Sequence, residues 1–498
     1  MKHEKQATVL IIGAGIGGIA TAARLARNGY QVTVVEKNEI PGGRCGQMIL
    51  NGYRFDTGAT LFLMPGLYAE TFAALGERMD EHLDLHRLDP TYHLYFQDNS
   101  RLQLTSDMQG MMEQLEDIES GSFSHLLSYL GAGGRLYNLS MQSLVGRDFI
   151  HLFEFINPRM ILLFLRLKAL TPHSRFVRRF FKDPRLQMAF TFQDMYMSLS
   201  PYEAPALYSM MQYTELADGL YYSMGGMYRI AQELAAIAEK MGVEFVYNAP
   251  VEKILVDGNR ATGLALADGR TLTADIIVAN ADLGYVYRSL LPDDGSAKRL
   301  DRMEYGCATI MFYWGLDKRY AQLGPHNLFL NGDYRQSFVD IFKRNTMPEQ
   351  PNFYIHSPAQ LDPSVAPAGG DAWYVAVPVG HIDEKTLQDF PAMQRKARAF
   401  ILKRLAEFGM TDVENHIKVE ASFTPPDWQQ RYNLTAGSAH GLSHKLTQMA
   451  YFRPHKRHRY YQNLYFVGAS THPGTGVPTV LTSARLAAEC IMRDTKAS

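Results

Sequence analysis

Short apolar runs alternate along this chain with glycine-rich turns and with stretches of helical spacing. Near the start, the apolar run Thr8–Ile12 is followed by helical spacing over Ile19–Asn28 and by a second apolar run, Gln31–Val35. Gly29 ends the predicted helix. The order strand, helix, strand is typical of a βαβ unit, so the pattern predicts an α/β fold.

The same alternation returns in the middle and at the end of the chain. In the middle it predicts a helix, strands and a hairpin: Tyr228–Met241, Val243–Tyr247, Val251–Val256, the hairpin Gly263–Leu272 and the buried strand Ala274–Asn280. At the end, the strand Leu464–Val467 leads through a glycine-rich loop to helical spacing over Thr479–Met492. Pro478 suits the first turn of that last helix.

Four glycines follow the first strand, in the run Gly13-Ala14-Gly15-Ile16-Gly17-Gly18. Gly13 permits a tight turn, Gly15 lets the backbone approach a pyrophosphate, and Gly18 lets helix and strand pack closely. The free N–H groups at the helix start attract phosphate. Glu36 ends the second strand, where a carboxylate accepts hydrogen bonds from ribose hydroxyls. The sequence therefore predicts a dinucleotide site.

Composition excludes several classes of protein. With 498 residues, 46% of them hydrophobic, the chain is long enough for two packed domains. A net charge of −1 gives no global attraction to nucleic acid. The three cysteines form neither a CxxC pair nor a metal-ligand spacing, so we expect a cytoplasmic protein without disulfides or a metal site. No segment is apolar enough to predict a transmembrane helix.

Two further motifs, Pro41-Gly42-Gly43-Arg44 and Asp56-Thr57-Gly58-Ala59-Thr60, follow the first unit. They resemble the extended fingerprint of flavoproteins in the amine oxidase and carotenoid desaturase superfamily, which simple NAD dehydrogenases lack. The C-terminal loop Gly468–Pro478 and the block Tyr451-Phe452-Arg453-Pro454-His455 resemble the bacterial phytoene and dehydrosqualene desaturases. This resemblance covers nearly the whole chain and is weakest around residues 105–200.

The resemblance implies a bound FAD and a discontinuous, Rossmann-like FAD-binding domain made of residues 1–75, 225–300 and 455–498. Residues 76–224 and 301–454 would form a mixed α+β substrate-binding domain. The strand that contains Val251 would lie beside the adenine, and the N-terminus of the last helix could face the flavin. The residues predicted to bind FAD are Gly13, Gly15, Gly17, Gly18, Glu36, Lys37, Gly43, Arg44, Gly58, Thr60, Val251, Gly468, Thr475, Gly476 and Val477.

The stretch Asp148–Leu170 is strongly apolar but interrupted by charges, and residues 147–185 carry nine Lys/Arg against three Asp/Glu. This pattern favours a helical segment that lies in a membrane surface over a core helix with a basic face, since a polyene substrate must leave the bilayer. Phe190–Met227 is rich in Met, Tyr and Phe, which suit an apolar tunnel and a core equally well.

The resemblance further implies a desaturase that acts on a C30 or C40 carotenoid precursor, dehydrosqualene or phytoene, by hydride transfer to the flavin and proton loss. The loop with Thr475 and Pro478 favours a C30 substrate. A quinone or oxygen is the expected electron acceptor, and nothing in the sequence sets the oligomeric state. A carotenoid oxidase or saturase on the same scaffold, an amine oxidase and, in a different class, a prenyl-lipid carrier are the alternatives.

Two acidic residues are candidates for the catalytic acid/base. Asp148 matches an acidic position proposed for this role in phytoene desaturases, although His151 stands where those enzymes often carry arginine. Glu215 is the second candidate, in the segment that leads to the glycine pair at 225–226. His472, in the C-terminal loop, fits a catalytic or a loop-structuring role. For both acids a structural role competes with catalysis.

Overall fold

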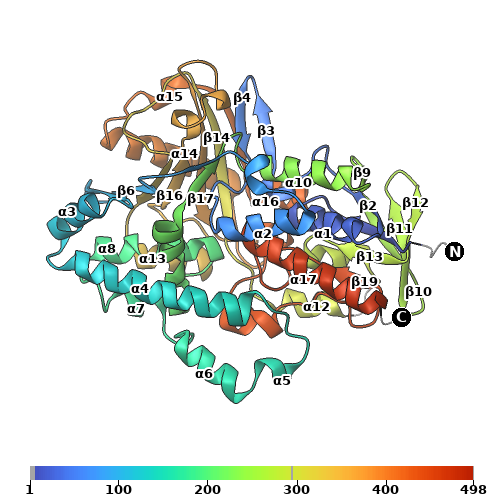
Figure 1. Cartoon of the computed structure of the whole chain (residues 1–498). Helices are drawn as coiled ribbons and strands as arrows, with labels where there is room; N and C mark the ends of the chain where they lie inside the picture. The colour runs from blue at the N-terminus through green and yellow to red at the C-terminus, as the bar shows by residue number, and fades with distance from the viewer. Residues whose placement is uncertain (1–5, 293–294, 497–498) are drawn as a thin grey trace.

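Five strands from distant parts of the sequence form one parallel sheet in the computed structural model, which describes residues 6–292 and 295–496 (Figure 1). Their order across the sheet is β19-β13-β1-β2-β9, and every neighbouring pair is parallel. The strands are β1 (Thr8–Ile12), β2 (Gln31–Val35), β9 (Glu244–Val246), β13 (Ile276–Ala279) and β19 (Leu464–Phe466). Residues from both ends of the chain therefore meet in this sheet.

The parallel sheet is covered on both faces, which explains why β1 is apolar without alternation. Val9 and Ile11 pack into a core with four helices, and Leu10 and Ile12 pack into a second core with a three-stranded antiparallel sheet. The helices are α1 (Ile16–Arg27), α2 (Pro65–Leu75), α10 (Tyr228–Lys240) and α17 (Val477–Lys496), and the antiparallel strands are β10 (Val251–Asp257), β11 (Arg260–Leu266) and β12 (Thr271–Thr273).

The predicted α/β fold is confirmed, and the bounds predicted for β1 and β2 are those observed. The first helix begins at Ile16 rather than Ile19, because Gly17 and Gly18 lie inside its first turn. The last helix begins at Val477, so Pro478 occupies its first turn as predicted. The three cysteines are buried free thiols.

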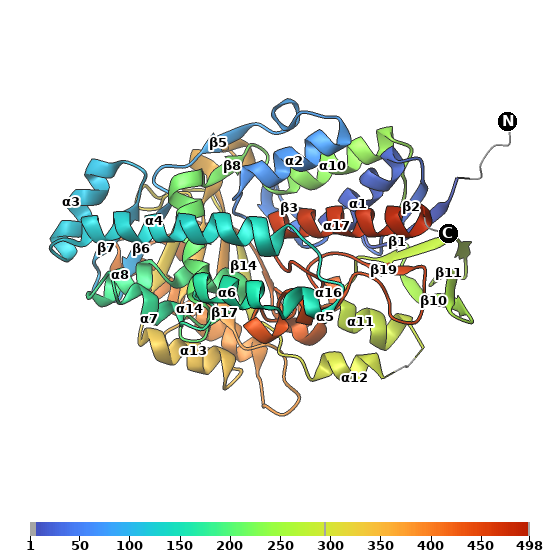
Figure 2. The same ribbon diagram turned by 60° about the horizontal axis from the view of Figure 1, so that its bottom comes forward.

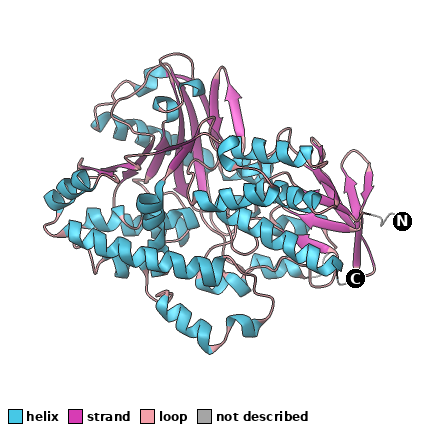
Figure 3. Ribbon diagram, in the orientation of Figure 1, coloured by secondary structure: helices cyan, strands magenta, loops and turns pink. Residues whose placement is uncertain are grey.

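A second, larger sheet has the strand order β18-β14-β17-β16-β15-β6-β7. Figure 3 shows the strands gathered in two regions, one around this sheet and one near the two chain ends. Side chains of β14 alternate between two environments: Ile310 and Phe312 pack into a core with α14 (Phe390–Glu407), whereas Thr309 and Met311 face a cavity. The strands are β6 (Tyr92–Phe96), β7 (Arg101–Leu104), β14 (Ala308–Leu316), β15 (His326–Leu330), β16 (Phe353–His356), β17 (Asp371–Val379) and β18 (Ile417–Phe423).

Helices close the cavity on the side opposite the large sheet. The segment 148–170 forms two short helices, α5 and α6, rather than one long one. Figure 1 shows them protruding below α4, and Figure 2, turned to bring this side forward, shows them at the front. The helices of this region are α3 (Met108–Ile118), α4 (Ser122–Ser140), the π-helix η3 (Met141–Val145), α5 (Leu152–Phe155), α6 (Pro158–Arg166), α7 (His173–Val177), α8 (Pro184–Ala189), the 3-10 helix η4 (Phe192–Met197), α9 (Met210–Tyr213) and the π-helix η6 (Thr214–Gly219).

The remaining α-helices and strands connect these layers. They are α11 (Leu283–Tyr285), α12 (Ser296–Asp301), α13 (Tyr334–Phe342), α15 (Val413–His416), α16 (Pro425–Tyr432), and the paired strands β3 (Gln47–Leu50) with β4 (Tyr53–Asp56) and β5 (Leu85–Arg87) with β8 (Tyr221–Ser223). In the described ranges, no helix is both long and apolar enough to cross a bilayer.

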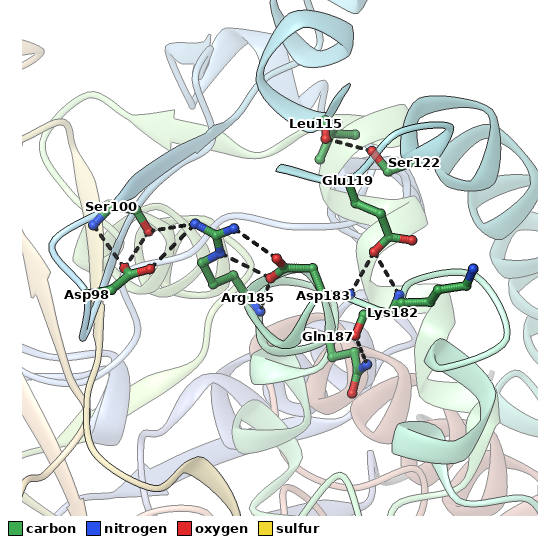
Figure 4. Close-up of polar contacts among 9 residues, drawn as sticks. All are labelled: Asp98, Ser100, Leu115, Glu119, Ser122, Lys182, Asp183, Arg185 and Gln187. Carbon is green, nitrogen blue, oxygen red and sulfur yellow. Dashed lines mark hydrogen bonds and ion pairs between the residues drawn. The ribbon is translucent and has the colours of Figure 1, made fainter. Parts of the chain in front are cut away.

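Part of the basic stretch 147–185 is engaged in contacts within the protein (Figure 4). Arg185 donates to both carboxylate oxygens of Asp183, at 3.1 and 2.8 Å, and lies 3.5 Å from Asp98. The Glu119 carboxylate accepts hydrogen bonds from the backbone N–H groups of Lys182 and Asp183. These contacts fix the start of α8 against α3, so Arg185 is held by acidic neighbours rather than free for an external anion.

Candidate functional site

One continuous cavity of about 760 Å³ runs along the carboxyl edge of the parallel sheet and under the large sheet. At the first of these places it is lined by the residues that directly follow the strands: Gly13 after β1, Glu36 after β2, Asn280 after β13 and Gly468 close after β19. Ligands of doubly wound folds bind at this edge, where the strands end and helices begin. The carboxyl edge is therefore the candidate binding site.

The glycine loop forms a cradle that only small residues permit. Gly15 is the N-cap of α1 and supplies no side-chain cap, so the first N–H groups of the helix stay open toward the cavity. A Cβ on Gly15 would lie 2.9 Å from Asn280 Nδ2. Gly18 does not line the cavity; a Cβ there would lie 2.2 Å from the Gly13 carbonyl oxygen, so this glycine serves helix–strand packing as predicted.

Glu36 is buried, and its carboxylate is oriented by the backbone. One oxygen accepts from Ala14 N–H at 2.8 Å, and the other accepts from Asn38 N–H at 2.9 Å. These bonds fix the carboxylate at the cavity wall, where it can accept from ribose hydroxyls. The neighbouring Lys37 donates to Gln430 O and Asn433 Oδ1 and so ties the end of β2 to α16.

The second glycine motif approaches the first one closely. A Cβ on Gly43 would lie 3.3 Å from Gly15 Cα, and one on Gly58 would lie 2.0 Å from the Arg44 carbonyl oxygen. Arg44 lines the cavity and donates to Ala439 O at 2.7 Å. Gly58 and Thr60 line the cavity beside it, and Thr60 Oγ1 is 2.9 Å from the Tyr354 hydroxyl of the large sheet.

The C-terminal loop completes the cradle. Gly468, Thr475, Gly476 and Val477 all line the cavity, and the two glycines have positive φ of 101° and 105° that other residues rarely adopt. The loop is held from behind by Arg453, which is 1% exposed. Its guanidinium donates to five backbone carbonyls, those of Leu442, Ser443, Gln448, Ala469 and Thr471.

These features fit a flavin dinucleotide. Three features meet in one place: an open helix N-terminus, glycines at positions where a Cβ would fill the cradle, and a buried carboxylate at the end of β2. Val251 lines the same cavity. That Val251 contacts the adenine stays a prediction. Asn280 and Arg453 are site residues that the sequence reasoning did not assign; the position of Asn280 directly after a buried strand is the signal that could have indicated it.

Under the large sheet the cavity is an apolar chamber. Side chains from η3, η4, α9 and β14–β17 line it, and seven methionines take part: Met64, Met141, Met195, Met197, Met210, Met211 and Met311. The stretch Phe190–Met227, whose composition suits a tunnel and a core equally, contributes to both. Phe192, Tyr196 and Met211 line the chamber, and Leu220 and Tyr222 pack in a core.

Neither acid/base candidate lines the cavity. Asp148 pairs with Lys456 Nζ at 2.8 Å, and Glu215 is buried one layer behind Tyr196. His472 also lies outside the lining and is 3.1 Å from the Leu144 carbonyl through Nε2. Burial and the nearby Lys456 lower the pKa of His472 to about 3, which fits a neutral, loop-structuring histidine. Among the residues the structure describes, no cluster of His, Cys, Asp and Glu suits a metal.

The fold and this site define a flavin-dependent oxidoreductase of the amine oxidase type. The profile of the family described as flavin containing amine oxidoreductase matches residues 16–492. The chain is 43% identical over 97% of its length to a zeta-carotene-forming phytoene desaturase from Myxococcus xanthus, 93% of which is covered. It is 34% identical to a 4,4'-diapophytoene desaturase from Staphylococcus haemolyticus, over 98% of this chain and 99% of that one.

The chain belongs to the carotenoid desaturase family within the flavin-containing amine oxidoreductases. Among solved structures, a mutant of putrescine oxidase superposes with a TM-score of 0.66 at 16% identity, covering 99% of each chain. At that identity the likeness concerns the fold alone. The predictions of an FAD cofactor and of this family are thereby confirmed.

Proposed function

We propose that this protein is an FAD-dependent desaturase that introduces double bonds into an acyclic C40 polyene of the phytoene type. The observation that carries the proposal is the single cavity, which joins the dinucleotide cradle to a methionine-rich apolar chamber. A long hydrocarbon has no polar group to recognise, so it must be positioned by shape, and flexible methionines adapt to such a chain. Bound FAD supplies the hydride acceptor, and the protein supplies orientation and a dry site.

The choice of C40 over C30 rests on the relatives. Identity is 43% with the phytoene desaturase of Myxococcus xanthus and 40% with that of Neurospora crassa, against 34% and 33% with two 4,4'-diapophytoene desaturases. The higher identity with the phytoene desaturases extends over nearly the whole chain. It therefore outweighs the preference for C30 that the sequence of the short C-terminal loop indicates.

We further propose that FAD is held by the predicted cavity-lining residues, with Gly18 acting in packing. The division into residues 1–75, 225–300 and 455–498 for FAD and 76–224 and 301–454 for the substrate is part of the same proposal. Its support is that β1, β2, β9, β13 and β19 come from the first set and the large sheet comes from the second. A quinone or oxygen would reoxidise the flavin, because one dinucleotide fingerprint is present in the sequence.

The polyene reaches the chamber from a membrane surface in this proposal, with the protein peripheral on the cytoplasmic face. Eight of the fifteen large apolar side chains that are exposed in the described residues lie between positions 150 and 170. They include Phe153, which is 69% exposed, and Leu165, which is 61% exposed, while exposed Arg147, Arg159 and Arg166 flank them. Apolar side chains bordered by arginines suit a bilayer with anionic headgroups.

The position of α5 and α6 supports this route. Their inner side chains Phe155 and Leu163 share a core with Leu144 of η3. Met141 and Val145, from the same π-helix, line the chamber. The exposed apolar surface is therefore separated from the chamber by one helix.

Expression in cells that make phytoene, and separately in cells that make dehydrosqualene, tests the function. We expect products two hydrogens lighter per step, with a longer conjugated chromophore, in the phytoene background. Coloured product only from dehydrosqualene would overturn the C40 assignment. Colourless extracts in both, from protein that retains FAD, would overturn desaturation and point to an oxidase or saturase.

A further inference from the structure

A buried carboxyl group lies one layer behind the wall of the apolar chamber. Glu215 is 1% exposed and belongs to the π-helix η6, an element that is frequent at functional sites. The Tyr92 hydroxyl donates to Glu215 Oε1 at 3.2 Å, and Gln193 Nε2 donates to Oε2 at 2.8 Å. Among the described residues no cation forms an ion pair with it.

Two tyrosine hydroxyls connect this carboxyl group to the chamber. The Tyr92 hydroxyl lies 2.6 Å from the Tyr196 hydroxyl, and Tyr196 lines the cavity. Tyr92 and Glu215 do not line it and are shielded from water. The order Tyr196, Tyr92, Glu215 is therefore an unbroken hydrogen-bonded path from the chamber to a buried acid, and Tyr196 also interacts with Glu215 directly.

One other base lies behind the chamber wall: His326 Nδ1 is 2.6 Å from the hydroxyl of Tyr354, which lines the cavity. Burial lowers the pKa of His326 well below its ordinary value, so it is a weak proton acceptor. The ionisable acidic and basic side chains that line the cavity, Glu36, Lys37, Arg44, Asp282 and His440, belong to the cradle or to the loop that Arg44 contacts. Asp148 is outside the lining and neutralises Lys456. A proton lost from a hydrocarbon in this chamber thus has the Tyr196 hydroxyl as its route to a buried carboxylate.

Resting on the proposed function, we propose that Tyr196 takes the proton that the polyene loses and that Tyr92 passes a proton on to Glu215. Formation of each double bond requires the loss of a hydride, with its electron pair, and of a proton from the adjacent carbon. Bound flavin would accept the hydride. As the C–H bond of the adjacent carbon breaks, its electron pair forms the new C=C bond and the proton binds Tyr196 Oη. The Tyr196 proton moves to Tyr92 Oη, and the Tyr92 proton moves to a Glu215 carboxylate oxygen. When product leaves, the proton returns by the same path to water that enters the chamber, which regenerates the carboxylate.

Among Glu215 and the titratable groups around it, Glu215 is the one whose pKa lies near neutral pH. Burial raises its pKa to about 8. Burial also raises the pKa values of the surrounding tyrosines well above their ordinary value, so they stay protonated; these are Tyr92, Tyr129, Tyr196 and Tyr354. Burial lowers the pKa of His326, beside Tyr92, so it stays neutral. The buried pair of Asp194 and His173 lies beyond Gln193, Gln212 and Tyr129.

The experiment follows anaerobic bleaching of the flavin in the purified holoprotein mixed with phytoene-loaded liposomes. We expect Glu215→Gln and Tyr196→Phe to slow bleaching about 100-fold or more, the range of a lost general base. Glu215→Asp should recover part of the rate, because the carboxylate returns. The wild-type rate should rise with pH through about 8, and that rise should be absent in Glu215→Gln. Flavin content should be unchanged throughout.

Tyr95→Phe is the matched control. Tyr95 lies on β6 like Tyr92 and is buried, but its hydroxyl donates to Gln322 O and it packs in the opposite core. Its rate should stay within about twofold. Wild-type rate and pH profile in both Glu215→Gln and Tyr196→Phe would overturn the relay while leaving desaturation intact. Absence of bleaching in the wild type would overturn the proposed function itself, and the relay with it.

Discussion

Lys456 Nζ lies 2.8 Å from Asp148 Oδ1, and this ion pair joins the segment before α5 to the segment before β19. Lys456 is 3% exposed, so its ammonium group depends on the carboxylate for compensation. Burial acts to raise the pKa of Asp148, but Lys456 outweighs it and the pKa lies below its ordinary value. Asp148 therefore acts as a counter-ion in this structure, at a position where catalysis was a sequence-based hypothesis.

Asp148→Asn should destabilise the protein. It leaves the buried Lys456 without a charge partner, which should lower the free energy of unfolding by about 1–3 kcal/mol. Thermal and urea unfolding of the holoprotein measure this change. Combining Asp148→Asn with Lys456→Met removes both charges and should recover most of the loss. Unchanged stability with lost turnover in the single variant would instead favour a catalytic Asp148.

Gly15→Val should abolish FAD retention. A Cβ at this position would lie 2.9 Å from Asn280 Nδ2, in the space where the backbone must approach the pyrophosphate. The ratio of flavin absorbance to protein absorbance after purification measures the effect. Gly66→Val is the control, because a Cβ on Gly66 meets nothing within 4 Å. Full flavin content in Gly15→Val would falsify the assignment of this loop to the cofactor.

Phe153→Glu combined with Leu165→Glu should weaken binding to anionic liposomes at least tenfold. Each change removes an apolar side chain whose burial is worth about 1.5–3 kcal/mol and adds a charge that anionic headgroups repel. Co-sedimentation measures the binding. Ile49→Glu is the matched control, since Ile49 is 66% exposed but lies in β3, at the top of Figure 1, with α5 and α6 at the bottom. An equal loss of liposome binding in the double variant and in Ile49→Glu would contradict a membrane-binding face on α5 and α6.

Glu215 should make the protein less stable as pH rises. Its pKa is about 8 when folded, against an ordinary value of 4.5, so the folded state binds the proton more tightly. Its contribution to stability is therefore greatest below pH 4.5 and is lost between about 4.5 and 8, by a few kcal/mol. Glu215→Gln should flatten this decline in unfolding measurements across that pH range. Parallel declines in wild type and variant would show that another group causes it.

Local pattern predicted the elements of the parallel sheet well. Thr8–Ile12 is apolar after its first residue because both faces of the sheet are covered, whereas Gln31–Val35 keeps polar residues at positions 31 and 33. Gly18 is required within the glycine loop itself, since a Cβ there would lie 2.2 Å from the Gly13 carbonyl oxygen. Such demands act on neighbouring residues, so they are visible in sequence. The same holds for Pro478, which fits the first turn of α17.

The sequence by itself determined the dinucleotide fingerprint, the family and the apolar–basic character of residues 147–185, since each depends on residue types at short spacing. Only the tertiary structure decided that Glu215 lies behind Tyr196 and Tyr92 at the chamber wall, that Asp148 neutralises Lys456 and that Arg453 supports the C-terminal loop. These relations join residues up to 308 positions apart. Their partners are set by how the two sheets and the helices pack, and no local pattern of apolar and polar positions records that packing.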